Sequence, residues 1–155
     1  MFRGEFEGLS IIYKTVPESA PQPIAWGQCE ESPDVFFFLC EYIDMDDGVS
    51  ELSTFCDAVA KLHENAVSPN GKFGFHVVTC NGNIPQLNDW ESSWEVFFSN
   101  GLKHMLKLYA EKHGERSEVV TAAQSILDVV IPRLLRPLQE GGRSIVPVLV
   151  HGDLW

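Results

Sequence analysis

The stretch PIAWGQCEESPDVFFFLCEYI, residues 23–43, decides the fold class of this 155-residue chain. Two apolar runs of β-prone residues flank a turn that contains Pro33 and Asp34, and this pattern predicts an antiparallel hairpin. The second run, residues 35–43, shows no alternation of apolar and polar residues, so we expect this strand to be buried on both faces. The main β-structure therefore lies early in the chain.

The segments around the hairpin have apolar residues at spacings of three and four, which predict amphipathic helices. The first helix is expected over residues 1–13. Three more are expected after the hairpin: residues 51–65 with Ser50 as N-cap, residues 89–109 begun by Asn88 and Glu91, and residues 118–138 with a bend at Pro132. Strands that come early and helices that come later indicate an α+β fold.

Two other segments lack the helical pattern. Residues 67–87 are rich in Gly, Pro and Asn, and a long loop of this kind in a compact domain is often functional. Residues 144–150, SIVPVLV, follow two glycines and predict a short buried strand. That strand would end at HGDLW, residues 151–155.

Composition and charge restrict the function classes. Hydrophobic residues make up 45% of the chain, enough for one core, which argues against intrinsic disorder. The apolar runs are far shorter than the roughly 20 residues of a membrane span. The N-terminus is acidic where a secretory signal would be apolar, so we expect a cytoplasmic protein with no membrane partner. The net charge of −11 argues against a nucleic-acid partner.

The acidic residues are concentrated in residues 1–57, which carry 12 Asp and Glu against 2 Lys and Arg. Residues 58–155 carry 10 acidic and 9 basic residues. Two interpretations stay open. The first is a solvated acidic surface, and the second is a surface that faces a basic partner, in another chain or in sequence outside these residues.

No residue set has the spacing of a metal site. The four cysteines have neither a CxxC spacing nor a His pair at zinc-ligand spacing, so we expect no zinc site and no disulfide framework: Cys29, Cys40, Cys56 and Cys80. Asp44, Asp46 and Asp47 could bind a divalent cation, but they lack the further ligands and glycine of a calcium loop. A solvated turn before a helix explains these three aspartates, and we expect no metal ligand within the chain.

The strongest signal for chemistry is the HGD motif, His151, Gly152 and Asp153, after the expected strand. In phosphoryl transfer, an Asp at the end of a strand can orient the attacking hydroxyl and accept its proton, and a nearby His can hold the loop. A polar turn that leaves a strand explains the same residues without chemistry, so both interpretations stay open on spacing alone. The sequence contains no GxSxG nucleophile elbow and no GxxxxGK[ST] or GxGxxG phosphate loop.

Together with other blocks, the HGD motif resembles the fructosamine kinase family, also called ketosamine 3-kinases or protein-ribulosamine 3-kinases, whose relatives include aminoglycoside phosphotransferases. The blocks are FGFHVVTCNGNIPQLNDW (residues 73–90), WEVFF (residues 94–98) and HGDLW. MFRGEFEGL (residues 1–9) and FFFLCEYIDM (residues 36–45) also look like the first-lobe helix and the strand that runs into the hinge of this family. The resemblance covers essentially the whole chain.

The resemblance implies a protein-kinase-like fold with ATP between two lobes. Residues 1–43 would be the remainder of the N-lobe, and residues 44–155 the first part of the C-lobe. In the family, the lysine that binds the ATP phosphates precedes this region, and the Asn and Asp that bind Mg²⁺ follow HGDLW. We therefore expect this chain to be a partial kinase domain that is inactive by itself, because the charge on the transferred phosphoryl group has no stabiliser.

The resemblance also implies roles for nucleotide-binding residues. Glu5 would pair with the lysine that binds the ATP phosphates, and Cys40 would occupy the gatekeeper position. The backbone of Glu41, Tyr42 and Ile43 would form the hinge that holds adenine.

The same resemblance implies the chemistry at the sugar. Asp153 would be the catalytic base for the sugar 3-hydroxyl, His151 would organise the loop, and Trp155 would be a wall of the sugar pocket. The substrate would be a ketosamine or a glycated protein, and the unstable 3-phosphorylated product would leave the protein amine, which is deglycation. A small-molecule kinase of the aminoglycoside or choline type and a non-catalytic pseudokinase-like binding module stay open as alternatives.

Overall fold

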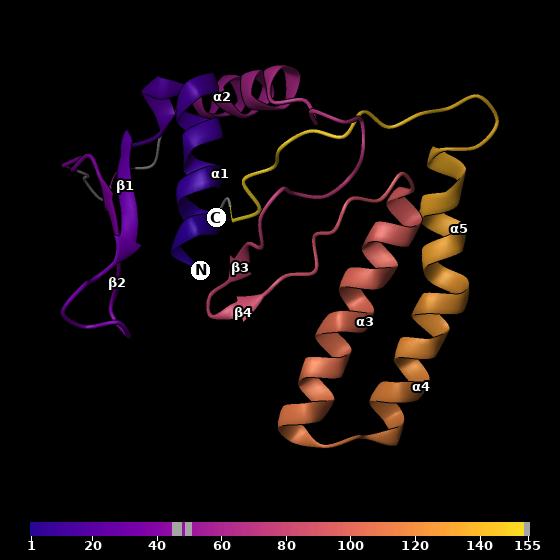
Figure 1. The fold of residues 1–155 in the computed structure, drawn as a ribbon. Helices are drawn as coiled ribbons and strands as arrows, with labels where there is room; N and C mark the ends of the chain where they lie inside the picture. Colours follow the sequence, from indigo (N-terminus) through magenta and orange to yellow (C-terminus); the bar gives the residue numbers. More distant parts are fainter. Residues whose placement is uncertain (45–47, 49–50, 154–155) are drawn as a thin grey trace. The chain divides into compact units, whose positions relative to one another are not determined.

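A computed structural model describes residues 1–44, 48 and 51–153, and it confirms the α+β class. The chain forms two compact units (Figure 1). Unit 1 comprises Met1–Ser68 and the chain from Val148 onward, and unit 2 comprises Pro69–Pro147. The proposed lobe boundary between residues 43 and 44 stays a prediction.

Unit 1 contains the predicted first helix, the hairpin and the predicted second helix (Figure 1). Its elements are α1 (Phe2–Thr15), the 3₁₀ turn η1 (Pro17–Ser19), β1 (Pro23–Gln28), β2 (Phe36–Cys40) and α2 (Leu52–Asn65). The side-chain carboxylate of Glu51 caps α2 by accepting the N–H of Thr54 at 3.1 Å. Ser50, the expected cap, lies outside the described residues.

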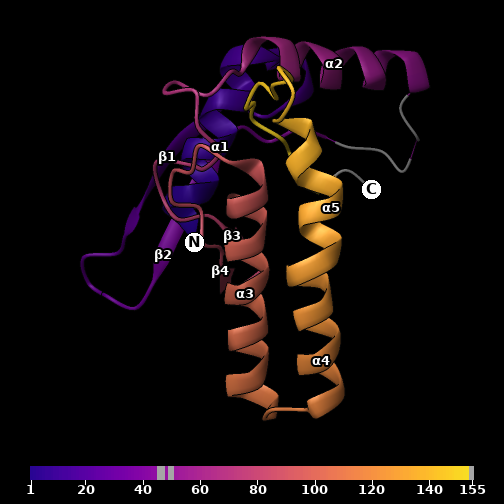
Figure 2. The ribbon, with the colours of Figure 1, turned by 90° about the vertical axis from the view of Figure 1, so that its right-hand side faces the viewer.

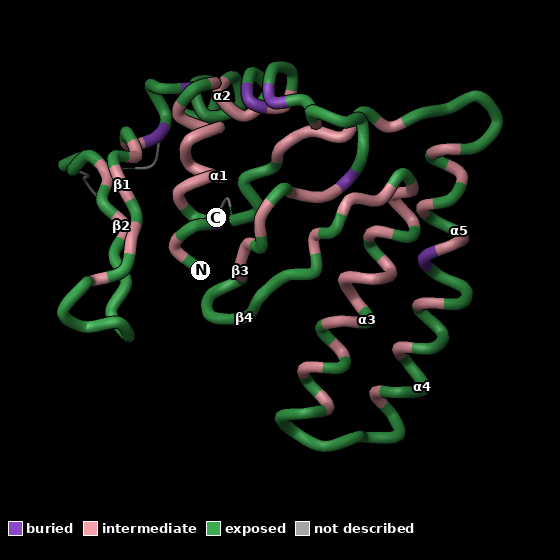
Figure 3. The backbone as a smooth tube through the Cα atoms, in the orientation of Figure 1, coloured by how far each residue is buried: buried purple, intermediate pink, exposed green. Residues whose placement is uncertain are grey.

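The hairpin is antiparallel as predicted, but the expected burial of its second strand on both faces is wrong. Trp26 lies opposite Phe38, and the ring of Phe38 meets that of Phe6 of α1 edge-on at 6.4 Å between centroids. Phe37 and Leu39, which point to the other face, are 42% and 50% exposed. Among the described residues only two strands make up this sheet, which is too small to bury both faces of a strand (Figure 3).

The core of unit 1 is a small apolar cluster that joins distant parts of the sequence. We call Val16, Leu62 and Ala66, with exposed fractions of 2%, 4% and 8%, the α1–α2 cluster. Ile11 and Ile12 of α1 pack against it, and so does Leu149. The segment before the HGD motif therefore belongs to the core of this unit.

The predicted strand over residues 144–150 is wrong in extent. Only Val148 forms a β-bridge, antiparallel to Val67, and Val146 and Val150 are 61% and 60% exposed. Pro147 has no N–H to donate, which removes one possible hydrogen bond from a ladder at this position. The segment keeps an attachment to the core but not the geometry of a strand.

Unit 2 is mainly a pair of helical rods joined by a short turn. Its elements are β3 (Cys80–Asn81), β4 (Ile84–Pro85), α3 (Trp94–His113), α4 (Ser117–Ser125), the π-helical segment η2 (Ile126–Val130), α5 (Ile131–Leu135) and the 3₁₀ turn η3 (Arg136–Leu138). The run from α4 to η3 lies beside α3 in both views (Figures 1 and 2). None of the helices in the described part of the chain combines the length and apolar composition needed to cross a membrane.

The helical run after α3 confirms the expected helix over residues 118–138 and shows how it accommodates Pro132. The N–H of Ile131 donates to the carbonyl of Ile126, five residues earlier, instead of four. Pro132 cannot donate to the preceding turn, and its ring would crowd the carbonyl of Asp128 in a regular α-helix. A wider π turn immediately before the proline relieves this conflict.

The expected start of α3 at Asn88 is wrong. The Asn88 side-chain amide donates to the carbonyl of Val77 and to the hydroxyl of Thr79, both at 3.0 Å, and so organises the preceding loop. The helix begins at Trp94, and the hydroxyl of Ser93 accepts the N–H of Val96 at 3.3 Å. Asn and Ser are both good caps, so the sequence pattern could not decide which of the two starts the helix.

The predicted loop over residues 67–87 is held together by pairing with the residues that follow it. Phe73 and Glu91 exchange two backbone hydrogen bonds of 2.8 Å, and β3 pairs with β4 near the tip. Gly74 has a φ of +141°, and a Cβ there would lie 2.9 Å from the carbonyl oxygen of Asn88. Only glycine fits this close approach, so the FGFH block has a structural reason for its glycine.

The exposed apolar side chains of the hairpin predict self-association of a polypeptide made of residues 1–155. Replacing both Phe36 and Leu39 with Thr removes two side chains that are 48% and 50% exposed, and keeps residues that favour strands. We expect the dissociation constant for self-association to rise by about tenfold or more, since burial of each side chain in the interface would contribute roughly 1 kcal/mol to the free energy of association. Light scattering over a dilution series measures this change.

Val129→Thr, the same kind of change at a position of unit 2 that is 59% exposed, serves as the control and is expected to leave self-association unchanged. A parent polypeptide that scatters as a monomer at every concentration contradicts the prediction.

Candidate functional site

The HGD motif leaves the core of unit 1 at the end of α2. Ala66 is the residue that ends this helix, and its carbonyl accepts the N–H of Leu149 at 2.8 Å. The bridge between Val67 and Val148 lies beside this bond. The chain is thus fixed two residues before His151.

The motif itself forms a turn on the surface. His151, Gly152 and Asp153 are all exposed. Gly152 has a φ of +83°, in the left-handed region that favours glycine, and a Cβ there would have open space around it. The requirement for glycine is therefore one of backbone conformation, which directs the two flanking side chains, and not one of space.

Glu5 lies near the start of α1, and the end of this helix packs against the α1–α2 cluster. It is in the first turn of α1 and exposed, and no ion pair of its carboxylate occurs among the described residues. Glu5 and Ile12 are seven residues apart, so they lie on the same face of α1, about 10 Å apart along its axis. Ile12 packs against the α1–α2 cluster that Leu149 also contacts. The structure therefore brings the Glu5 helix and the HGD segment together in one unit.

The residues predicted to form a hinge, Glu41, Tyr42 and Ile43, follow the hairpin directly. The N–H of Glu41 donates to the carbonyl of Gln22 at 2.8 Å, and the N–H of Gln22 donates to the Glu41 carboxylate at 3.1 Å. Tyr42 and Ile43 are 85% and 44% exposed, and their backbone groups make no hydrogen bond with other described residues. Cys40 is half-buried at the end of β2. Residues 42 and 43 thus offer backbone groups without a hydrogen-bond partner among the described residues, immediately after a paired segment.

Two of the predicted site features fall outside the described residues. Trp155 is one, and the pair Asp46 and Asp47 of the candidate cation cluster is the other. Among the described residues, no three His, Cys, Asp or Glu side chains gather in a way that could hold a metal ion.

The two units differ sharply in charge. Unit 1 carries 14 acidic and 3 basic residues, a net charge of −11, whereas unit 2 carries 8 of each and is neutral. One of the three basic residues, Lys61, forms an ion pair of 2.7 Å with Glu18, and its hydrogen bond lowers the pKa of that carboxyl. The whole net charge of the chain therefore lies in the unit that holds the HGD motif.

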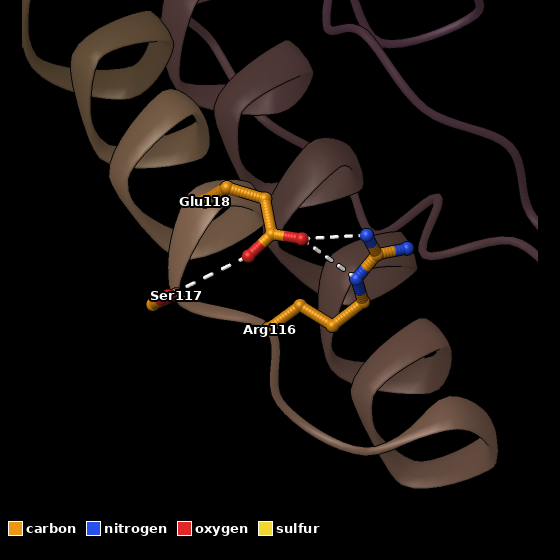
Figure 4. Close-up of polar contacts among 3 residues, drawn as sticks. All are labelled: Arg116, Ser117 and Glu118. Carbon is orange, nitrogen blue, oxygen red and sulfur yellow. Dashed lines mark hydrogen bonds and ion pairs between the residues drawn. The ribbon is translucent and has the colours of Figure 1, made fainter.

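A shallow apolar groove between α3 and α4 in unit 2 is a poorer candidate site. Glu118 is the ionisable residue among those that line it, which also include Leu102, Leu106 and Val119. Glu118 accepts from Arg116 at 2.5 and 2.9 Å and from the Ser117 hydroxyl at 3.5 Å (Figure 4). Its own backbone N–H and these partners lower the pKa of Glu118. This exposed carboxylate is engaged in starting a helix and is poorly suited to proton transfer.

The sequence pattern did not identify the residues that hold the motif. Leu149 lies within the buried strand expected over residues 144–150, but nothing in the sequence pairs it with Ala66. Ala66 is a small residue directly after a helix, and Leu149 is a Leu before a polar motif. Both patterns are too common to reveal a pairing across 83 residues. The contact becomes evident only in the folded unit.

Comparisons with known proteins identify the class. The model of the fructosamine kinase family matches residues 1–155. A ketosamine-3-kinase of Mus musculus is 32% identical over 179 residues, which cover 100% of this chain and 55% of the mouse protein. A chloroplastic protein-ribulosamine 3-kinase of Oryza sativa subsp. indica is 31% identical over 156 residues, which cover 100% of this chain and 43% of the rice protein.

Structural comparison agrees with these matches. A crystal structure from Haemophilus somnus 129PT that carries the name of a fructosamine-3-kinase has a TM-score of 0.61 and 27% identity. The match covers 83% of this chain and 44% of that one. The fold is therefore part of a kinase-like α+β fold, and the chain belongs to the fructosamine kinase family. It spans about half the length of the curated relatives it matches.

The cap of α2 predicts a measurable pH dependence. Hydrogen bonds from the hydroxyl of Ser53, and then from the N–H and hydroxyl of Thr54, lower the pKa of Glu51 to about 2. Because the folded-state pKa is depressed, the stabilisation of α2 by this carboxylate is fully present above the ordinary pKa near 4.5. It is lost as the pH falls toward 2.

An NMR titration of the Glu51 carboxyl carbon tests this expectation, and the substitution Ser53→Ala is expected to move the midpoint upward. A midpoint of the parent chain at or above the ordinary value of 4.5 would show that the capping bonds do not form in solution.

Proposed function

We propose that the protein to which this chain belongs transfers the γ-phosphoryl group of ATP to the 3-hydroxyl of a protein-bound ketosamine, fructosamine or ribulosamine, and so leads to deglycation. The observation that carries the proposal is the HGD turn fixed to the end of α2, in a chain that the fructosamine kinase model matches from residue 1 to residue 155. The names of the mouse and rice relatives support the ketosamine class of substrate.

In this proposal, the residues of the HGD turn act on the sugar. The Asp153 carboxylate accepts a hydrogen bond from the 3-hydroxyl and then its proton as the oxygen attacks phosphorus. Phosphoryl transfer depends mainly on position and electrostatics, so the fixed backbone before the turn matters as much as the carboxylate. His151 holds the turn, and Trp155 forms one wall of the sugar pocket.

The nucleotide would lie against the hinge and α1. The exposed backbone groups of Tyr42 and Ile43 fit the polar edge of adenine because they have no hydrogen-bond partner among the described residues. The free carboxylate of Glu5 suits a lysine that binds the phosphates, and Cys40 borders the base. When bound, the nucleotide supplies the phosphoryl group as an electrophile.

The described residues do not fit a magnesium site by themselves, since no three carboxylate or imidazole groups come together. The Mg²⁺ that accompanies ATP in this proposal must find most of its ligands elsewhere in the protein. We therefore assign no step of the reaction to the metal.

Replacing Asp153 with Asn in the intact protein tests the proposed base. We expect kcat for ATP-dependent phosphorylation of a ketosamine to fall by about 10²- to 10⁴-fold, because the amide cannot accept the proton. Asp57→Asn, the same chemical change at an exposed position of α2, is the control. ³¹P NMR of the product locates the phosphate on the sugar.

Each other outcome points to another function. Transfer to choline or an aminoglycoside but not to a ketosamine favours a small-molecule kinase. Absence of transfer by the intact protein favours a binding module. A polypeptide of residues 1–155 alone is expected to show no turnover, and ketosamine-dependent turnover by it would overturn that part of the proposal.

The charge of unit 1 further supports a protein substrate rich in lysine. The net charge of −11 on unit 1, which carries the HGD turn, attracts basic substrates over about one Debye length, roughly 10 Å at 0.1 M salt. We expect the intact protein to prefer a glycated peptide flanked by lysines over the same peptide flanked by glutamates. The expected ratio of kcat/KM is about tenfold or more at low salt and falls toward one in 0.5 M salt, roughly where charges are screened.

Steady-state kinetics on the two peptides at several salt concentrations measure this ratio, with free fructosyl-glycine as the control of low charge. Equal kcat/KM values at low salt would mean that the acidic residues of unit 1 are only a solvated surface.

We propose a cytoplasmic location, although the rice and Arabidopsis thaliana relatives carry the word chloroplastic in their names.

A further inference from the structure

We propose that Leu149 is a positioning residue that couples α1 to the HGD turn through the α1–α2 cluster. In this arrangement the placement of the helix that carries Glu5 and the orientation of Asp153 depend on one small core. The catalytic meaning of the coupling rests on the function proposed above, whereas its structural part stands on the contacts alone.

The first observation is that one core holds three segments that are far apart in sequence. Val16 follows α1, Leu62 and Ala66 end α2, and Leu149 comes 83 residues after Ala66. Val16 and Leu62 are only 2% and 4% exposed, although most large apolar residues of the described chain are partly accessible. Densely packed contacts transmit a displacement because they cannot deform freely.

The second observation is that the HGD turn has little else to hold it. Val150 is 60% exposed, and residues 151–153 are exposed as well. The backbone of residues 150–153 makes no hydrogen bond with the rest of the described chain. The attachments nearest to the turn are therefore the bond from Leu149 to Ala66, the bridge of Val148 and the packing of the Leu149 side chain.

The third observation is that the position of Glu5 on α1 depends on the same cluster. Ile12 packs against the same cluster as Leu149, and Glu5 lies two turns away on the same helix face. A shift of α1 along or around its axis therefore moves Glu5 and disturbs the support of the HGD turn at the same time. Removing the Leu149 side chain is expected to loosen both ends of this connection.

The experiment uses the intact protein with four variants, one of which is a stability control. Leu149→Ala removes the packing, Leu149→Met keeps the volume, and Val150→Ala shortens the neighbouring exposed side chain. Ile131→Ala, at a site 3% exposed in unit 2, controls for general loss of stability. Hydrogen–deuterium exchange is measured for peptides that cover residues 2–12, 23–40 and 148–153.

We expect Leu149→Ala to accelerate exchange about tenfold or more in residues 2–12 and 148–153, and to leave the hairpin peptide 23–40 unchanged. The other three variants are expected to leave all three peptides as in the parent. In turnover assays, Leu149→Ala is expected to raise KM for ATP and lower kcat together, each by roughly fivefold or more, and Leu149→Met to restore both.

Faster exchange in residues 148–153 with no change in residues 2–12 overturns the coupling, and so does equal acceleration in the hairpin, which would mean a merely structural role. If Leu149→Ala fails to fold, Leu149→Val takes its place with a smaller cavity. A parent protein without ketosamine turnover contradicts the proposed function, but the exchange data still decide whether α1 and the turn are coupled.

Discussion

The hydrogen bond from the Leu149 N–H to the Ala66 carbonyl is the contact on which the candidate site depends. It satisfies a carbonyl at the end of α2 that has no partner within the helix, and it holds the chain two residues before His151. The side chain of Leu149 then adds apolar packing against the α1–α2 cluster. Directional bonding and packing together place a surface turn that has few other attachments. In the proposed function, they would hold the Asp153 carboxylate while it stays open to a substrate.

Much of the fold could be predicted because the relevant forces are local. Apolar spacing located the helices that became α1, α2 and α3, and the turn between two β-prone runs located the hairpin. The errors arose where tertiary contacts decide the outcome. Asn88 bonds to its own loop instead of capping α3, and residues 144–150 form only the bridge of Val148 instead of a strand. The burial of the strand Phe36–Cys40 was overestimated because an apolar run does not reveal how many strands surround it.

The candidate site could also be predicted only in part from the sequence. The HGD motif and the hinge were recognisable from residue types and from a resemblance that the family match confirms. The roles of the individual residues in these segments stay proposals. Ala66 and Leu149 could not be found from the sequence, since nothing in their local patterns indicates that they meet. The distribution of charge between the two units could be seen only in the fold. The sequence shows that residues 1–57 are acidic, and the fold shows that the HGD motif lies in the same unit as these residues.

The central claim is that the segment before the HGD motif is packed into the core formed by α1 and α2. Methyl-labelled NMR of the protein tests it most directly through nuclear Overhauser effects of the Leu149 methyl groups. We predict cross-peaks from these methyls to methyl groups of the α1–α2 cluster, Val16, Leu62 or Ala66. Assigned Leu149 methyl groups that show cross-peaks only to their sequence neighbours would contradict it.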